Sequence, residues 1–89
     1  MLGFRWIDWN LEKVAGHNVS PYEAEYVVNH AAPPYPRIID DRKRLVWGQA
    51  QGGDYLQVIY LLDSEDEAFV IHARPLTEQE KRRLRRSLR

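Results

Sequence analysis

Three prolines within four residues divide this chain into a helical part and a strand-rich part. Pro33, Pro34 and Pro36 follow two alanines. Proline lacks an amide proton and restricts the residue before it, so a helix cannot continue through this stretch. Helix-capping residues precede the prolines, whereas β-branched and aromatic residues dominate the runs that follow them. The chain is therefore expected to place its helices and strands in separate segments.

Two helices are predicted before the prolines. Asn10 is expected to cap a short helix that continues to about residue 16. A second helix should begin at Ser20, because serine suits the N-cap and Pro21 suits the first helical position. Glu23, three residues after the serine, completes a capping box. This helix is predicted to continue to about residue 30.

After the prolines, apolar runs separated by turn residues predict antiparallel strands. The candidate strands are residues 37–40, 44–50, 55–62 and 68–74. Gly52 and Gly53 join the two longest runs and predict a hairpin with positive φ at its turn. Pro75 is expected to end the last strand. Thr77 and Glu80 then form a second capping box, which predicts a C-terminal helix.

The predicted order is two helices, a meander of three to four strands, and a basic helix. This order is typical of a single α+β domain over residues 1–89, with helices covering one face of an antiparallel sheet. No strand is expected before residue 31. The residues expected to share the core are apolar and lie at alternate strand positions or on helix faces: Val14, Val27, Val46, Leu56, Val58, Tyr60 and Val70.

The composition limits the class of protein. Eighty-nine residues suffice for one hydrophobic core. The absence of cysteine excludes a disulfide scaffold and a thiolate site. The first six residues lack a basic region followed by an apolar stretch, so no signal peptide is predicted. The longest apolar run is too short to span a membrane. We therefore expect a cytoplasmic protein without a membrane association.

Positive charge is concentrated at the C-terminal end. The formal net charge of the chain is zero, but residues 77–89 carry six cationic side chains against two glutamates. The cationic residues are Lys81, Arg82, Arg83, Arg85, Arg86 and Arg89. Such a patch can attract a polyanion through its local potential. The alternative is a solvated helix whose arginines maintain solubility.

Two stretches of the sequence resemble a known family. Residues 9–27 read WNLEKVAGHNVSPYEAEYV, and residues 71–80 read IHARPLTEQE. In this order they are similar to the patterns WNxxKxxxHGVSxxExxxV and IxARxxTxxE of BrnT-like proteins, and the likeness covers almost the whole chain. Asn18 stands where the family has glycine. Asparagine is the residue most able to share the left-handed backbone of glycine, so this departure is compatible with the fold.

The resemblance implies both a fold and a function. BrnT-like proteins are ribonuclease toxins of bacterial type II toxin–antitoxin pairs and have a RelE-like fold. By this likeness, the chain would be an endoribonuclease that needs neither metal nor cofactor and is neutralised by a cognate antitoxin protein. It would form homo-oligomers or hetero-oligomers with that antitoxin.

Cleavage of RNA without metal requires a base, an acid and a cation that stabilises the phosphorane. Arg74 is the first candidate for the phosphate-binding cation, because it matches the family arginine and guanidinium offers a planar donor fork. The alternative is an ion pair with Glu80 or Asp63. His72 lies two residues away and should share the sheet face of Arg74. It is a candidate acid or base, although a histidine packed against the helices is an equal alternative.

Further candidates come from the helical part and from the aromatic residues. His17 is a second titratable candidate, and Lys13 lies one helical turn before it. A histidine that satisfies helix-end carbonyls and a surface lysine are the alternatives. Trp47 and Tyr60 could stack on RNA bases, although aromatic residues in the strands of a small domain more often belong to the core. Arg82, Arg83, Arg85 and Arg86 are the candidates for binding the RNA backbone.

Other kinds of chemistry find little support in the sequence. The three histidines and the carboxylates show no metal-ligand spacing, and no Gly-rich nucleotide-binding loop is present. Three classes of function remain: an endoribonuclease toxin, a catalytically inactive relative that binds protein or nucleic acid, and an interaction domain whose basic helix binds an acidic partner. A neighbouring reading frame for a DNA-binding antitoxin would favour the first class.

Overall fold

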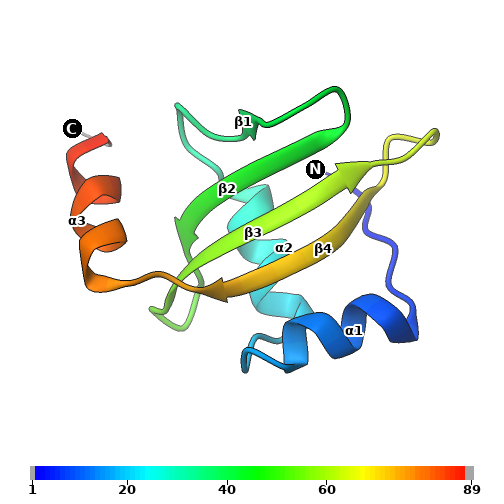
Figure 1. The fold of residues 1–89 in the computed structure, drawn as a ribbon, viewed down its shortest axis with the longest axis horizontal. Coiled ribbons are helices and arrows are strands. Elements are labelled where there is room, and N and C mark those ends of the chain that lie inside the picture. Colours follow the sequence, from blue (N-terminus) through cyan, green and yellow to red (C-terminus); the bar gives the residue numbers. More distant parts are fainter. Residues whose placement is uncertain (1, 88–89) are drawn as a thin grey trace.

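The computed structural model describes residues 2–87, which form three helices and one four-stranded sheet (Figure 1). The elements in chain order are α1 (Asp8–Ala15), α2 (Pro21–Asn29), β1 (Arg37–Ile38), β2 (Lys43–Gln49), β3 (Tyr55–Leu62), β4 (Ala68–Pro75) and α3 (Glu78–Ser87). The strands pair antiparallel in the order β1-β2-β3-β4. The predicted α+β fold with an antiparallel meander is confirmed.

The first helix begins earlier than predicted. Asn10 was expected at the N-cap, but Ile7 occupies that position and Asn10 is the third helical residue. The Asn10 side chain is fully buried; its Oδ1 accepts from the Ile7 backbone N–H at 2.7 Å, and its Nδ2 donates to the Arg5 carbonyl at 3.0 Å. Asn10 therefore still accepts a hydrogen bond from a backbone N–H at the start of the helix, but its side chain does so from within the first turn.

The start of α2 follows the prediction closely. Glu23 N–H donates to Ser20 Oγ at 3.1 Å, and Ser20 N–H donates to Glu23 Oε1 at 2.9 Å, which completes the capping box. Asn18 has φ of 60°, so it adopts the left-handed conformation predicted for this position. The chain can thus turn sharply between α1 and α2.

The strands also lie close to their predicted ranges. The turn between β2 and β3 places Gly53 at φ of 108°, a conformation that glycine adopts without a steric penalty. Before residue 31, one isolated parallel bridge joins Phe4 to Ala68. It adds two backbone hydrogen bonds beside β4 without forming a strand: Arg5 N–H to Ala68 O, and Ala68 N–H to Gly3 O.

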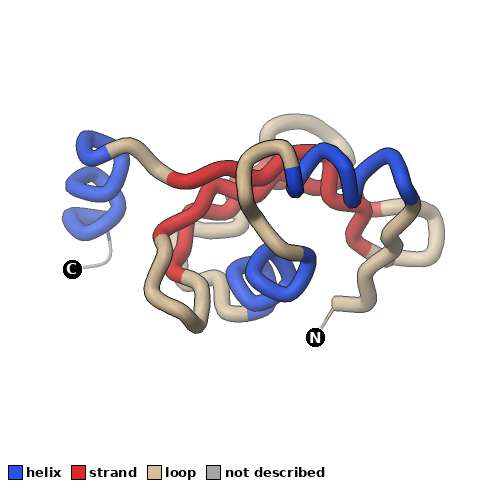
Figure 2. Tube along the Cα trace, turned by 90° about the horizontal axis from the view of Figure 1, so that it is seen from below, coloured by secondary structure: helices blue, strands red, loops and turns tan. Residues whose placement is uncertain are grey.

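The sequence predicted that the helices cover one face of the sheet, but only α2 does so. Figure 2 shows α2 below the sheet, whereas α1 lies beside the edge formed by β4, and Val14 of α1 is part of the core. Aromatic packing explains the position of α1, because the Trp9 ring stacks on Phe69 of β4 with centroids 6.0 Å apart. The C-terminal helix α3 stands beyond one end of the sheet (Figure 1).

The core lies between α2 and the sheet face that it covers. All seven residues predicted to share the core are buried. Gly48 allows the close approach of α2, because a Cβ atom at this position would lie 3.2 Å from Val27 Cγ1. The spacing of Leu76, Leu84 and Leu88 predicts that they lie near one side of the C-terminal helix, which would dock on the sheet. Leu84 of α3 and Leu76, which precedes the helix, are buried and attach α3 to the core. Leu88, predicted on the same side, lies outside the described residues.

Candidate functional site

The sheet face opposite α2 carries the polar and aromatic candidates. Strand register places Trp47 opposite Gln57, Gln57 opposite Arg74, and Ile59 opposite His72. Directly opposed residues point to the same side of a sheet, so these five side chains share one face, which we call the open face. It is bordered by α1 along β4 and by α3 at the end of the sheet (Figures 1 and 2). The prediction that His72 and Arg74 share a face is confirmed.

A β-bulge in β4 determines which side chains reach the open face. Ile59 pairs with His72, whereas its neighbour Tyr60 pairs with Val70, so Ile71 is the extra residue. Without the bulge, strict alternation would place Phe69 and His72 on opposite faces. With it, both lie on the open face, where Phe69 meets α1. Sequence alternation alone gives no sign of this shift.

Arg74 is held in place by four hydrogen bonds. Its Nη1 donates to Glu80 Oε1 at 2.8 Å and to the Pro75 carbonyl at 3.0 Å. Its Nη2 donates to Glu80 Oε2 at 2.8 Å and to Gln57 Oε1 at 3.3 Å. The bond from Arg74 lowers the pKa of Glu80 to about 2, and the same bond raises the pKa of Arg74. An ion pair with Glu80, the alternative role for this arginine, is therefore present in the structure.

Gln57 is a site residue that the sequence analysis missed. It is one of two buried polar residues among residues 2–87, with 8% of its surface exposed. Its Oε1 accepts hydrogen bonds from Trp47 Nε1 at 3.0 Å and from Arg74 Nη2. A glutamine within the apolar run YLQVIYLL was the available signal, because a buried amide requires polar partners. One amide oxygen thus connects the candidate phosphate-binding arginine to the candidate stacking tryptophan.

The structure brings His17 and His72 together. Their rings meet edge to face, with centroids 5.6 Å apart, although they come from the turn after α1 and from β4. The pKa of His72 is lowered, first by burial and then by the positive potentials of His17 and Arg74. A histidine in this setting is held largely neutral near pH 7 and can accept a proton. The pair is therefore suited to acid–base chemistry beside Arg74.

Three other sequence candidates lie elsewhere. Lys13 Nζ lies 5.3 Å from the centroid of the Trp9 ring, one turn back along α1. Tyr60 is buried in the core with 3% exposed, so its proposed stacking on bases is wrong and its core alternative is correct. Asp63, considered as a partner of Arg74, pairs with Arg5 at 3.4 Å.

The basic helix borders the open face with two of its arginines. The guanidinium carbon of Arg83 lies 5.5 Å from the Trp47 ring centroid, and that of Arg85 lies 5.6 Å from the Tyr55 ring. Arg82 and Arg86 are exposed. Cationic side chains of α3 therefore reach the aromatic residues at the end of the sheet.

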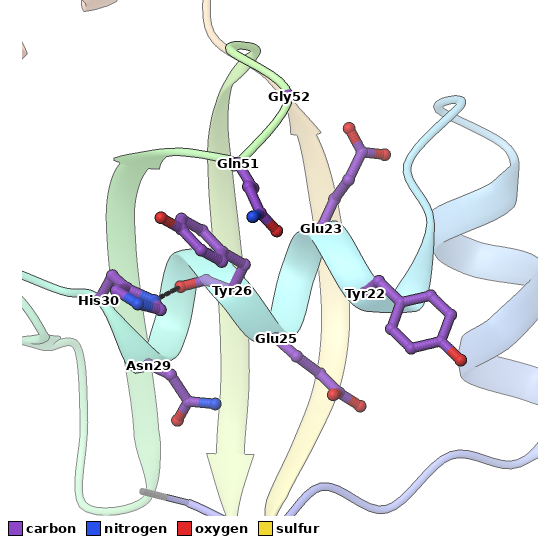
Figure 3. Close-up of a pocket in the computed structure, with 8 residues that line it drawn as sticks. All are labelled: Tyr22, Glu23, Glu25, Tyr26, Asn29, His30, Gln51 and Gly52. Atoms are coloured by element: carbon purple, nitrogen blue, oxygen red, sulfur yellow. Dashed lines mark hydrogen bonds between the residues drawn. The ribbon is translucent and has the colours of Figure 1, made fainter.

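The opposite side of the molecule has a different character. A hollow of about 590 Å³ lies on the outer side of α2, next to the turn between β2 and β3. Its lining residues are Tyr22, Glu23, Glu25, Tyr26, Asn29, His30, Gln51 and Gly52. Figure 3 shows Tyr26 beside Gln51, and the rings of Tyr26 and His30 stack with centroids 3.9 Å apart. The described residues of the lining include two glutamates and neither lysine nor arginine, so their charge does not suit a phosphate.

Within residues 2–87, no group of three or more histidine, aspartate and glutamate side chains is arranged to hold a metal ion. The same part of the chain has no helix with the length and apolarity needed to cross a membrane. No protein-family model, curated protein or solved structure shows a significant match to this chain. The geometry of the open face and the resemblance of the two sequence stretches are therefore the grounds for assigning a function.

Proposed function

We propose that this chain is a BrnT-like toxin: a metal-independent endoribonuclease, without a cofactor, that a small antitoxin protein neutralises. The observation that carries the proposal is the grouping of His17, His72 and Arg74 beside a basic helix. His17 and Arg74 belong to the two stretches that resemble BrnT-like proteins, and they are far apart in the sequence. A cation, two titratable rings and arginines for the RNA backbone are the groups that metal-independent cleavage requires.

The roles follow from the chemistry of each group. One histidine removes the proton from the 2′-hydroxyl, and the other protonates the leaving oxygen. The lowered pKa of His72 favours the neutral form, which is the form that a general base needs. Arg74 binds the non-bridging phosphate oxygens as negative charge develops on them. Lys13, whose ammonium lies over the Trp9 ring, has no assigned role in this proposal.

The ion pair of Arg74 also favours a second candidate function. Both Nη atoms of Arg74 already donate to protein acceptors, two of which belong to Glu80. A phosphate must therefore compete with a carboxylate for this guanidinium. An inactive relative, in which Arg74 only attaches α3 to the sheet and the same surface binds protein or nucleic acid, would have this arrangement.

Expression in a bacterial host separates the two candidates. The wild-type chain should arrest growth and the purified protein should cleave RNA in the presence of a chelator. His72→Gln should lose both effects, whereas His30→Gln, on the other side of the sheet, should retain them. Co-expression of a neighbouring reading frame that encodes a DNA-binding protein should restore growth. RNA binding without cleavage or growth arrest would instead support the inactive relative.

A further inference from the structure

We infer that a small pocket between α3 and the β1–β2 side of the sheet binds one nucleobase of a single-stranded RNA. This inference rests on the proposed function, because it names the form of RNA that the open face would accept. The pocket has a volume of about 180 Å³. Its lining residues are Tyr35, Arg37, Leu45, Trp47, Arg83 and Ser87. Tyr35 and Arg37 were not among the candidates found in the sequence.

The aromatic residues give the pocket a surface for stacking. The rings of Tyr35 and Trp47 have centroids 6.3 Å apart and planes inclined by 29°. Tyr35 is buried and forms part of the wall, whereas Trp47 is half-buried and remains accessible. The hydrogen bond from Trp47 Nε1 to Gln57 fixes the orientation of the indole ring. A rigid, partly exposed indole is a platform on which a base can stack.

Two arginines add positive charge next to these rings. The guanidinium carbon of Arg37 lies 5.7 Å from the Tyr35 centroid, and that of Arg83 lies 5.5 Å from the Trp47 centroid. Among the residues that the structure describes, none with a carboxylate side chain lines this pocket. A base that stacks on Trp47 displaces the Arg83 guanidinium toward the adjoining phosphate, so that the ring contact is exchanged for a charge-assisted hydrogen bond. An RNA nucleotide offers both the planar base and the anion that this arrangement requires.

The pocket is connected to the candidate catalytic groups. Gln57 Oε1 accepts from Trp47 on one side and from Arg74 on the other. A nucleotide whose base lies on Trp47 therefore has its backbone next to the arginine that would bind the scissile phosphate. A base can enter the pocket only when it is unstacked from its neighbours, which a duplex resists. The substrate is accordingly single-stranded RNA rather than a duplex.

Binding of modified oligonucleotides tests this inference apart from cleavage. Short single-stranded RNAs with 2′-O-methyl groups cannot be cleaved by attack of the 2′-oxygen, so they report binding alone. We would compare an intact oligonucleotide with a series in which one base at a time is removed, at fixed salt. Removal of the base that occupies the pocket should weaken binding roughly 5-fold to 150-fold, the loss typical of one stacked base. Removal of other bases should have smaller effects.

Protein variants locate the effect on the molecule. In Trp47→Leu and in Arg37→Gln, removal of the base should no longer weaken binding of the oligonucleotide. Arg37 is exposed, so Arg37→Gln should fold even if Trp47→Leu does not. Arg42→Gln has the same charge change at an exposed position outside the pocket and is the control. Tryptophan fluorescence should be quenched by the intact oligonucleotide in the wild type and less so in Trp47→Phe.

The outcomes distinguish this inference from the proposed function. Equal affinity for intact and base-free oligonucleotides would overturn the pocket while leaving the ribonuclease proposal in place. A base-dependent affinity in a protein that cleaves no RNA would support the pocket and contradict the ribonuclease. Failure to bind any single-stranded RNA, or tighter binding of a duplex, would overturn the inference itself.

Discussion

The two faces of the sheet are built from alternate residues of the same strands, yet they differ in almost every physical property. On the face covered by α2, Val46, Val58 and Val70 are fully buried. On the open face, the neighbouring positions hold Trp47 and other aromatic, amide, imidazole and guanidinium groups that are hydrogen-bonded or partly exposed. The comparison indicates that one face supplies the free energy of folding, while the other is available for binding and chemistry.

The largest expected effect tests this division with two leucines of β3. Leu56 lies on the covered face with 2% exposed, and Leu61 lies half-buried on the open face. Leu56→Ala should lower the free energy of unfolding by about 2–5 kcal/mol, because it leaves a cavity in the core. Leu61→Ala, the same chemical change, should cost clearly less. Chemical denaturation measures both values, and equal losses would contradict the division between the faces.

The next effect concerns activity rather than stability. Arg74→Ala should reduce the rate of RNA cleavage by on the order of 10²–10³, the loss typical of one group that stabilises developing charge. The melting temperature should change little, because a partly exposed ion pair contributes about 1 kcal/mol or less. Arg42→Ala is the control for charge. Full activity in Arg74→Ala, or unfolding of the variant, would assign this arginine to the structure instead.

The contribution of α3 to RNA binding should depend on how many of its arginines contact phosphates. Replacement of Arg82, Arg85 and Arg86 with glutamine should weaken RNA binding at low salt and flatten its salt dependence. The slope of log affinity against log salt should fall by about one unit for each RNA phosphate that the variant no longer binds. An acidic antitoxin surface would compete for the same arginines, so its affinity should fall as well. Unchanged binding of both would leave α3 as a solvated helix.

Substitution of Glu80 should have a smaller effect and should strengthen RNA binding rather than weaken it. This carboxylate neutralises Arg74, so Glu80→Gln should raise the affinity for RNA several-fold while keeping an oxygen acceptor near the guanidinium. Glu78→Gln is the matched control, because Glu78 is exposed and pairs with Lys81 at 3.1 Å. Titration of uncleavable RNA measures both. If Glu80 mainly orients Arg74, the affinity will fall in Glu80→Gln instead.

The smallest effect is a pH dependence of stability. Because burial lowers the pKa of His72 below its ordinary value of 6.5, the unfolded chain takes up this proton first as the pH falls. His72 should therefore reduce the free energy of unfolding as the pH falls from about 7 to 5. His72→Gln should remove this part of the decline, whereas His30→Gln should retain it. An identical decline in all three proteins would place His72 in a solvent-like environment.

Local sequence signals were sufficient to predict the elements of the fold. The capping boxes at Ser20 and Thr77 and the left-handed Asn18 are each decided by residues within a few positions of one another. Alternation along β3 likewise predicted which of its residues enter the core. The grouping of His72 with Arg74 also followed from this local rule.

Tertiary structure decided the features that join distant segments. Aromatic packing between Trp9 and Phe69 holds α1 along the β4 edge of the sheet, and the bulge at Ile71 changed the phase of β4. The contact between His17 and His72 joins the turn after α1 to β4, and the shared oxygen of Gln57 joins β2 to β4. The sequence determined the elements because capping and alternation are local interactions. The open face needed the folded chain, because its contacts join residues that are far apart in sequence.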